Sequence, residues 1–323
     1  MSRKIADMTV SDVGLGCMGF SHAYGAAMER KEAVRMLRLA YEIGYSFFDT
    51  AECYTGHDAA GRESLNEELV GEALRPVRDR VIIATKCGVK HLPGRRQELD
   101  SSPAAIRRAV EGSLRRLGVE RIDLYYQHRI DPKVEPETVA QTMQELIREG
   151  KIRHWGISEV GEEYLRRAHA VCPVAAVQNR FSMLARWYMP LLPTLEELGV
   201  ALVAFSPLAN GALSCDFETT FACPTDYRQG MPQFSPEGVA KNAQLLELLQ
   251  EIAVQKEATP AQVAMAWMLC KKPYIVPIPG SRKEARLREN FGAGALKLQP
   301  EEVAELDTRL TSMELAVYGY RPS

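Results

Sequence analysis

The sequence predicts an α/β protein, a (β/α)8 TIM barrel, on three observations. Short apolar segments alternate with longer amphipathic ones about eight times, at about 40 residues per repeat. The short segments are continuously apolar, as in parallel strands that are buried on both faces. Several of the longer segments end at a glycine, a frequent helix stop. We therefore expect residues 1–323 to form a single barrel domain, with a long loop after strand 7 and a C-terminal tail.

Strands are expected where β-branched and aromatic residues gather in runs too short to be helices. In chain order these runs are Val13–Leu15, Ser46–Asp49, Val81–Thr85, Ile122–Gln127, Ile152–Ile157, Ala175–Gln178, Ala201–Phe205 and Tyr274–Ile278.

Helices are expected between the strands, where apolar residues recur every three to four positions. In the first, Val34, Leu37 and Tyr41 share one stripe and Gly44 is the stop. Serine or threonine before proline is a typical helix start. The other expected helices are Pro103–Leu117 between Ser102 and the stop Gly118, Val139–Ile147 before Gly150, Leu191–Leu198 before Gly199, Pro260–Cys270 after Thr259, a helix starting near Glu237, and one starting at Ser281.

The segment between Phe205 and Glu237 breaks this rhythm with about thirty residues rich in proline and glycine. Loops longer than about 15 residues in compact domains are usually functional. This segment leaves the C-terminal end of a strand, the end at which barrel active sites lie. We expect it to contribute to the functional face.

Composition excludes several classes of protein. The 323 residues include 40 Lys and Arg against 42 Asp and Glu, a net charge of -2, with 46% hydrophobic residues. Disorder requires low hydrophobicity and high net charge. A balanced charge predicts neither a nucleic-acid nor an anionic-membrane partner. The sequence has no apolar run of membrane-spanning length and begins without the apolar core of a signal peptide.

The seven cysteines are scattered and never arranged as C-x-x-C. This pattern argues against a disulfide framework and a zinc site, and favours a reducing compartment. The histidines share no ligand spacing, so no metal is expected. We expect a cytoplasmic protein.

The cluster Gly14-Leu-Gly16-Cys-Met-Gly19 matches the dinucleotide pattern G-x-G-x-x-G. That pattern should open a helix at once, with an acidic residue about 20 positions later. Here no helical period appears before about Glu29. We interpret the glycines as a tight turn where the backbone closely approaches another group.

Four polar side chains lie at or just after the C-terminal ends of three consecutive strands: Asp49 and Tyr54, Lys86, and His128. In a barrel these strand ends converge on one cavity. Burying Lys86 or Asp49 alone would cost several kcal/mol, so we expect the two to pair. A purely structural ion pair and a core histidine are the alternative interpretation.

The chemistry that this group suggests is proton donation by a tyrosine. A phenol has a pKa near 10, and a neighbouring ammonium lowers it, so we expect Lys86 to acidify Tyr54. His128 could orient a carbonyl oxygen or relay the proton. Protein side chains cannot supply a hydride, which implies a reduced nicotinamide.

The motifs resemble those of the aldo-keto reductases over essentially the whole chain. Phe48-Asp49-Thr-Ala-Glu-Cys-Tyr54 is similar to the family's D-T-A-x-x-Y signature, and Gly150-Lys-Ile-Arg-His-Trp-Gly-Ile-Ser158 to its G-K-I-R-x-x-G-x-S strand. The resemblance implies NADPH-dependent reduction of small aldehydes or ketones, with Asp49, Tyr54, Lys86 and His128 as catalytic residues. The family's usual Asn after the serine is Glu159 here, and it is not carried over.

The resemblance also implies the residues that bind NADPH/NADP+. Ser158 and Gln178 would contact the carboxamide, Phe205 would stack on the nicotinamide, and Gly280, Ser281, Arg282 and Arg286 would surround the 2′-phosphate. A helix N-terminus at Ser281 with adjacent cations suits a phosphate, although a solvated basic face is the ordinary meaning of such spacing. The remaining cofactor positions are Gly19, Phe20, Asp49, Ser206, Pro207, Leu208, Glu289 and Asn290.

The segment Thr225–Phe234 resembles the D-x-R-x-x-x-P-R-F stretch of bacterial and plant members, with Gln233 for Arg, which places the chain outside the mammalian steroid and aldose branch. Tyr24, Trp187 and the Tyr318–Tyr320 tail are candidate pocket residues.

Two other functions stay open: an NADPH-binding regulatory subunit with slow turnover, and an aldolase in which Lys86 forms a Schiff base. The sequence leaves substrate, reaction direction and oligomeric state open.

Overall fold

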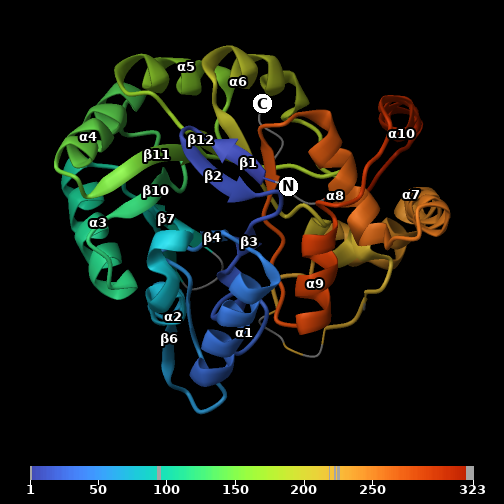
Figure 1. The fold of residues 1–323 in the computed structure, drawn as a ribbon, viewed down its shortest axis with the longest axis horizontal. Coiled ribbons are helices and arrows are strands. Elements are labelled where there is room, and N and C mark those ends of the chain that lie inside the picture. Colours follow the sequence, from blue (N-terminus) through green and yellow to red (C-terminus); the bar gives the residue numbers. More distant parts are fainter. Residues whose placement is uncertain (1, 93–95, 218, 222, 224–225, 318–323) are drawn as a thin grey trace.

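The computed structural model describes residues 2–92, 96–217, 219–221, 223 and 226–317 and shows a parallel eight-stranded sheet curled into a barrel (Figure 1). Two backbone bonds close the barrel where the first strand and its preceding residue meet the last strand and the residues after it: Gly14 N to Pro277 O at 2.9 Å and Gly16 N to Pro279 O at 3.2 Å. The (β/α)8 fold is therefore confirmed. Around the barrel the strands run in the order β3 (Leu15–Gly16), β4 (Phe47–Asp49), β7 (Ile82–Cys87), β10 (Ile122–Gln127), β11 (Ile152–Ser158), β12 (Ala176–Arg180), β13 (Ala201–Phe205) and β14 (Ile275–Pro277).

Helices surround the barrel (Figure 1). Predicted caps explain several boundaries: the Ser102 hydroxyl accepts the Ala105 amide at 3.3 Å, and Thr259 and Gln262 form a capping box. Gly118 ends its helix with φ 65°. The helices are α1 (Arg30–Ile43), α2 (Asn66–Leu74), α3 (Pro103–Leu117), α4 (Pro136–Arg148), α5 (Glu162–Val171), α6 (Leu192–Leu198), α7 (Pro236–Gln255), α8 (Pro260–Lys271), α9 (Glu284–Gly292) and α10 (Pro300–Ser312).

An N-terminal hairpin, β1 (Ser2–Ile5) and β2 (Met8–Ser11), lies across the N-terminal end of the barrel (Figure 1). Its buried Ile5, Met8 and Val10 belong to the same apolar cluster as the barrel-lining Phe47 and Leu124. The hairpin thus closes this end, and the site must lie at the C-terminal end of the strands. Two further hairpins leave that end: β5 (Thr55–His57) with β6 (Glu63–Leu65), and β8 (Val89–Leu92) with β9 (Arg96–Leu99).

The expected helix start at Ser281 is wrong. Helix α9 begins at Glu284, with Lys283 as its N-cap residue. The Ser281 hydroxyl accepts the Lys283 amide at 3.1 Å, only two residues on. This side-chain bond closes a local turn that gives the backbone an alternative to helical hydrogen bonding, and the helix begins only after it.

The long segment after β13 contains two short 3₁₀ helices, Ala209–Ser214 and Pro232–Phe234. It packs on the loop after β3: the Tyr227 amide donates to Ala23 O at 2.8 Å, and the Asn210 amide group donates to the Tyr24 hydroxyl at 3.0 Å. The first and seventh strand loops therefore meet beside the C-terminal end of the barrel.

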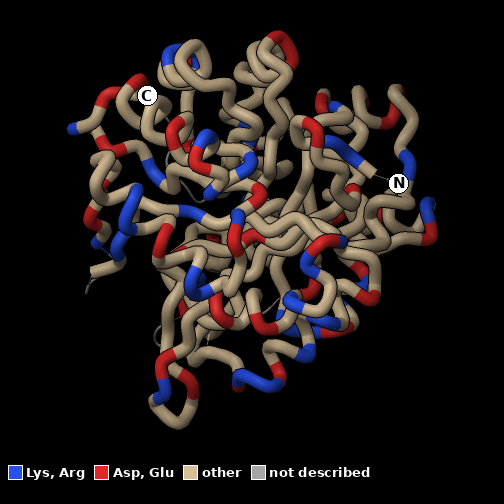
Figure 2. Tube along the Cα trace, turned by 60° about the vertical axis from the view of Figure 1, so that its left-hand side comes forward, with Lys and Arg blue, Asp and Glu red and all other residues tan. Residues whose placement is uncertain are grey.

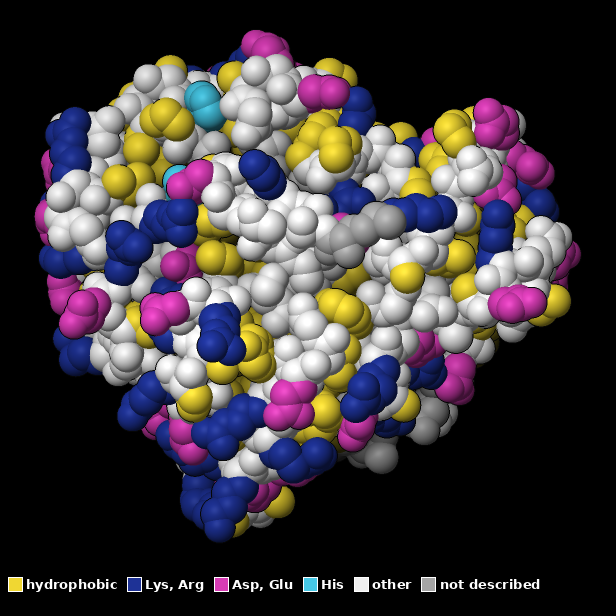
Figure 3. Space-filling model, viewed as in Figure 1, with side chains coloured by type: hydrophobic (Ala, Val, Ile, Leu, Met, Phe, Trp, Pro, Cys, Tyr) yellow, Lys and Arg dark blue, Asp and Glu magenta, His cyan; other side chains and the backbone are white. Residues whose placement is uncertain are grey.

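Charges of both signs are interspersed along the chain and over the face seen in the space-filling view (Figures 2 and 3). Of the helices in the described ranges, none combines the length and apolarity needed to cross a bilayer. Within those same ranges, no three His, Cys, Asp or Glu side chains are grouped so that they could hold a metal ion.

Candidate active site

Three of the four predicted catalytic side chains form one hydrogen-bonded chain at the C-terminal end of the barrel. Lys86, at the end of β7, is fully buried and donates to the Asp49 carboxylate and to Thr50 O, the latter at 2.8 Å. The Lys86 ammonium also lies 3.4 Å from the Tyr54 hydroxyl. The predicted ion pair is therefore present, and it ends at a phenol.

His128 completes the group from the end of β10. Its ring meets the Tyr54 ring edge-on, with centroids 5.7 Å apart. Its Nδ1 lies 3.5 Å from the Cys53 sulfur. Burial, followed by the positive charges of Arg129 and Lys86, holds the pKa of His128 well below its ordinary value. The imidazole is therefore neutral at pH 7.

The expected acidification of Tyr54 is corrected by the structure. Burial raises the pKa of Tyr54 to about 12, and the opposing pull of Lys86 recovers only part of this shift. Burial opposes the charge on Lys86, but the combined effects of the Asp49 carboxylate and of Tyr54 outweigh it, and the pKa of Lys86 rises. At neutral pH the phenol is protonated and lies beside a fixed ammonium.

The residues predicted to hold the nicotinamide lie beside this chain. The Gln178 amide donates to the second Asp49 oxygen at 2.7 Å, and the Ser158 hydroxyl donates to Gln178 O at 2.9 Å. Glu159 has a left-handed backbone with φ 56°, and its carboxylate accepts the Arg180 amide at 2.9 Å. The Glu159 carboxylate is thus bonded to the backbone at the end of β12.

Phe205 ends β13 and is half-buried at the same mouth. The Arg180 guanidinium lies 4.9 Å from the centre of its ring. The chain then turns sharply through Ser206, with φ 50°, Pro207 and Leu208. Gly19 and Phe20 lie on a 3₁₀ turn after β3, on the opposite side of the barrel seam.

The predicted phosphate residues divide into two groups. Arg282 turns back to the first loop, where it donates to Gly19 O and to Ala26 O, the latter at 2.9 Å. Arg286 instead pairs with Glu289 and Asp216, each at 2.6 Å. In the described part of the chain, Arg282 and Arg286 share no hydrogen-bond or ion-pair partner. The backbones of Gly280 and Gly16 are so close that a Cβ on Gly280 would lie 2.6 Å from Gly16 O.

Two orphaned polar atoms show that these groups still have bonding capacity. Within the described ranges, Arg282 Nη2 and Asn290 Oδ1 are buried without a hydrogen-bond partner. Buried polar atoms are normally paired. A guanidinium donor suits a phosphate, and an amide oxygen suits an exocyclic amine such as that of adenine.

Sequence reasoning missed Arg129 and the histidine pair His22 and His91. Arg129 follows His128 and donates to the Ser158 hydroxyl at 3.1 Å. The His22 ring stacks on His91, with centroids 4.8 Å apart, and faces the Tyr54 ring at 6.0 Å. A charged residue directly after an apolar strand end was the available signal for Arg129. The histidines come from separate loops, which spacing cannot bring together.

The other pocket candidates and the cysteines have local partners. The Tyr24 hydroxyl is bonded to Asn210, and the Trp187 and Tyr188 rings are 6.5 Å apart. Tyr318–Tyr320 lies outside the described residues. Burial raises the pKa of Cys53 to about 12, and Cys87 is also buried. Neither thiol is a ready nucleophile.

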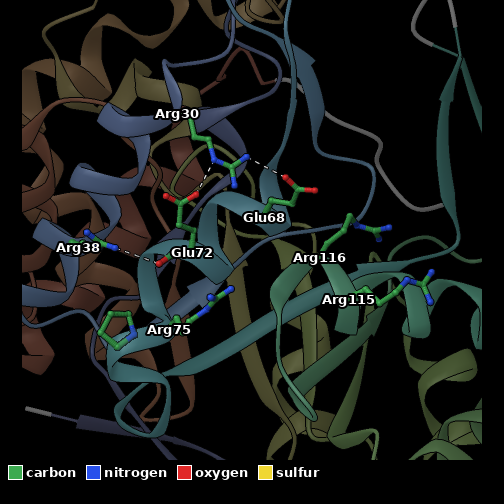
Figure 4. A pocket seen from close by; sticks show the side chains of 8 residues that line it. Arg30, Arg38, Glu68, Glu72, Arg75, Arg115 and Arg116 are labelled. Atoms are coloured by element: carbon green, nitrogen blue, oxygen red, sulfur yellow. Dashed lines mark hydrogen bonds and ion pairs between the residues drawn. The ribbon is translucent and has the colours of Figure 1, made fainter.

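A pocket of about 500 Å³ opens on the outer surface between α1, α2 and α3 (Figure 4). Arg30 in it pairs with Glu68 at 3.1 Å and with Glu72 at 2.7 Å. Arg75 and Arg115 lie near the C-terminal ends of α2 and α3, where cations stabilise the helix dipole. These ion pairs and helix ends give the arginines a structural explanation. None of the predicted site residues lines this pocket.

Comparison with known proteins agrees with the barrel and its strand-end residues. The family model described as the aldo/keto reductase family matches residues 12–310. The chain belongs to the aldo/keto reductase family.

Among its relatives, probable aldo-keto reductase 1 of Glycine max is 36% identical over 299 residues, which cover 92% of this chain and 84% of the relative. The solved glycerol dehydrogenase of Gluconobacter oxydans superposes with a TM-score of 0.84 at 27% identity, covering 97% of this chain and 95% of that one. A Klebsiella pneumoniae aldo/keto reductase in complex with NADP and acetate gives 0.71 at 27% identity, covering 97% and 96%. The similarity to bacterial and plant members is as expected.

Proposed function

We propose that the chain is an NADPH-dependent carbonyl reductase in which Tyr54 donates the proton to the carbonyl oxygen. The observation that carries this proposal is the chain of contacts from the buried Asp49 and Lys86 to the hydroxyl of the half-buried Tyr54. When bound, NADPH supplies the hydride for the carbonyl carbon and is thereby oxidised to NADP+. Barrel geometry, the family and the NADP- and NADPH-bound Klebsiella pneumoniae relatives support this assignment.

The proton transfer follows from the charges around Tyr54. The phenol keeps its proton at pH 7 and can give it to an oxygen that becomes an alkoxide, a stronger base than a phenolate. The phenolate left behind lies beside Lys86, 3.4 Å away, whose charge stabilises it. Asp49 holds Lys86 in place and keeps it protonated.

His128 positions the carbonyl oxygen in this proposal. Cys53 remains a thiol at neutral pH, so its S–H can donate to His128 Nδ1. That bond leaves the proton of the neutral ring on Nε2, which can donate to the carbonyl oxygen. His128 thus orients the substrate, while Tyr54 supplies the proton.

The cofactor would bind across the C-terminal end of the barrel. Ser158 and Gln178 would hold the carboxamide, Phe205 would stack on the ring, and Arg282, Arg286 and Asn290 would hold the distal phosphate and adenine. The orphaned Arg282 Nη2 and Asn290 Oδ1 support the distal part. Gly19, Phe20, Ser206, Pro207, Leu208, Gly280, Ser281 and Glu289 complete the proposed contacts, and we propose that residues 1–323 act as one cytoplasmic barrel domain.

The direct test is consumption of NADPH with a panel of small aldehydes and ketones. We expect turnover and an alcohol product. Bound NADPH with turnover below about one per minute for every carbonyl would favour the regulatory alternative. The aldolase alternative requires a neutral Lys86, which its pairing with Asp49 disfavours. Borohydride trapping of substrate on Lys86 without nicotinamide would overturn the reductase assignment.

A further inference from the structure

Arg129 occupies the space between the catalytic group and the proposed nicotinamide site. Its Nη1 donates to His128 O at 2.6 Å and to the Ser158 hydroxyl at 3.1 Å. Its guanidinium carbon lies 5.9 Å from the centre of the Phe205 ring. Arg129 also acts electrostatically on Tyr54, because its charge favours ionisation of the phenol and lowers the pKa against the larger effect of burial. The guanidinium is therefore within reach of a molecule that contacts Tyr54 and His128.

The charge of Arg129 is not balanced by a carboxylate in the described part of the chain. Three other half-buried arginines have close carboxylate partners: Arg78 with Asp123 at 2.8 Å, Arg116 with Glu67 at 2.6 Å, and Arg228 with Asp226 at 2.7 Å. Arg186 and Arg282 resemble Arg129 in bonding to backbone oxygens, but only Arg129 of these lies beside Tyr54 and His128. Within the described ranges, Arg129 uses only Nη1 for hydrogen bonds, and only toward neutral oxygens of its own site. Its Nε and Nη2 donors, which form the edge that binds carboxylates in a bidentate manner, remain available.

The neighbouring His91 ring adds no second positive charge at the mouth. Burial, followed by the charges of His22 and Arg129, lowers the pKa of His91 to about 4. The His22 Nδ1 lies 2.8 Å from Thr55 O, an acceptor, so this nitrogen carries the hydrogen. Asp49 is bonded to Lys86 and Gln178 and is unavailable to Arg129. Arg129 is thus a fixed cation at the mouth.

We propose that Arg129 binds a carboxylate of the substrate, so that the preferred substrates are oxo acids with a carboxylate within a few bonds of the reacting carbonyl. The proposal deepens the reductase function proposed above and rests on it. A substrate carboxylate would supply the missing counter-charge of Arg129 and orient the carbonyl toward Tyr54 and His128. Bidentate pairing with a guanidinium also explains why a planar carboxylate fits better than a neutral ester.

The test compares acids with their neutral esters. We would measure kcat/KM for glyoxylate, 4-oxobutanoate and 4-carboxybenzaldehyde against the methyl ester of each, in the native chain and in Arg129→Gln, Arg129→Lys and Arg115→Gln. Arg115 is exposed on α3 and serves as the matched control. We expect a preference of roughly tenfold to hundredfold for at least one acid. Arg129→Gln should lose it, Arg129→Lys should keep part of it, and Arg115→Gln should keep all of it.

Two further readouts separate the possible outcomes. The Kd of NADPH should change far less in Arg129→Gln than the acid-to-ester preference does, because Ser158 keeps its bond to Gln178 O. Benzoate should bind the NADPH-loaded chain more tightly than benzamide only when Arg129 is present. An equal acid-to-ester preference in the native chain and in Arg129→Gln would overturn the proposal. So would a loss of NADPH binding in Arg129→Gln together with slower reduction of the methyl-ester substrates. Arg129-dependent benzoate binding without any turnover would instead contradict the reductase function while supporting the carboxylate site.

Discussion

Burial and charge oppose each other at Tyr54, and the balance decides what the residue can do. The half-buried phenol lies beside Lys86, and desolvation of its hydroxyl raises the pKa of Tyr54 to about 12 despite the ammonium. The sequence predicted the contacts among Asp49, Lys86 and Tyr54, because strand ends converge in a barrel. It could not predict the sign of the shift, which depends on how much water reaches the hydroxyl. Nor could it predict the isolation of Arg129 from carboxylates.

Glu52, between Asp49 and Tyr54, should make stability depend on pH. Burial raises the pKa of Glu52 from 4.5 to about 7. Between these values the folded chain holds a proton that the unfolded chain has lost. The contribution to stability is therefore full below pH 4.5 and is lost as pH rises through 7, by at most about 3 kcal/mol.

Urea unfolding of Glu52→Gln at pH 5, 6 and 7 checks this expectation. The variant should show a flatter dependence of unfolding free energy on pH than the native chain, because glutamine does not titrate. Glu301→Gln, at an exposed position of α10, is the control and should keep the native slope. An unchanged slope in Glu52→Gln would refute the assignment.

At the scale of elements, local sequence signals were reliable where they coincide with tertiary structure. The caps Ser102 and Thr259 and the stop Gly118 lie where expected. The signal at Ser281 was misleading, because its hydroxyl closes a turn before α9. Helix α2 was not predicted separately, since it has only 9 residues and Leu65 gives it no side-chain cap. The hairpins β5–β6 and β8–β9 were not predicted either, because their strands of three or four residues are too short to show a period in the sequence.

The seam between β3 and β14 depends on the close approach of two backbones. A methyl group on Gly280 would lie 2.6 Å from Gly16 O, so Gly280→Ala should force the strands apart. We expect a loss of about 1–3 kcal/mol in the free energy of unfolding, measured by urea titration. The control is Gly161→Ser, at the N-cap position of α5, where a Cβ meets nothing within 4 Å and serine is a favoured residue; it should cost no more than a few tenths of a kcal/mol. Equal effects of the two substitutions would contradict this account of the seam.

At the scale of the whole molecule, the barrel brings together loops that are distant in sequence. Residues 205–208, 280–290 and 19–26 come from the seventh, eighth and first strand ends and meet around the seam. The hairpin at the N-terminal end leaves only the opposite end for an extended cofactor. Strand order alone therefore predicted the neighbourhood of the site, while the division of Arg282 and Arg286 between different partners required side-chain positions.

NADPH should stabilise the whole chain more than NADH does, through Arg286. At 100 times its Kd, a ligand stabilises the folded state by about 2.7 kcal/mol. Arg286→Met should weaken NADPH binding at least about tenfold and leave NADH binding nearly unchanged, because it removes a charge-assisted bond to the 2′-phosphate. Thermal unfolding with each nucleotide measures this difference.

Arg288→Met is the matched control on the same helix, because Arg288 pairs with Glu284 at 3.0 Å. It should bind both nucleotides as the native chain does. Equal weakening of NADPH and NADH in Arg286→Met would contradict the assigned contact.

Tyr54→Phe tests the central claim most directly, because it removes one hydroxyl and leaves the ring in place. The measurement is kcat/KM for aldehyde reduction beside the Kd of NADPH, in the native chain and the variant. We predict a fall in kcat/KM of roughly 10²- to 10⁴-fold with the Kd unchanged, since the proton donor is lost while the cofactor contacts remain. Near-native turnover in Tyr54→Phe, or an equal loss of NADPH binding, would contradict the account.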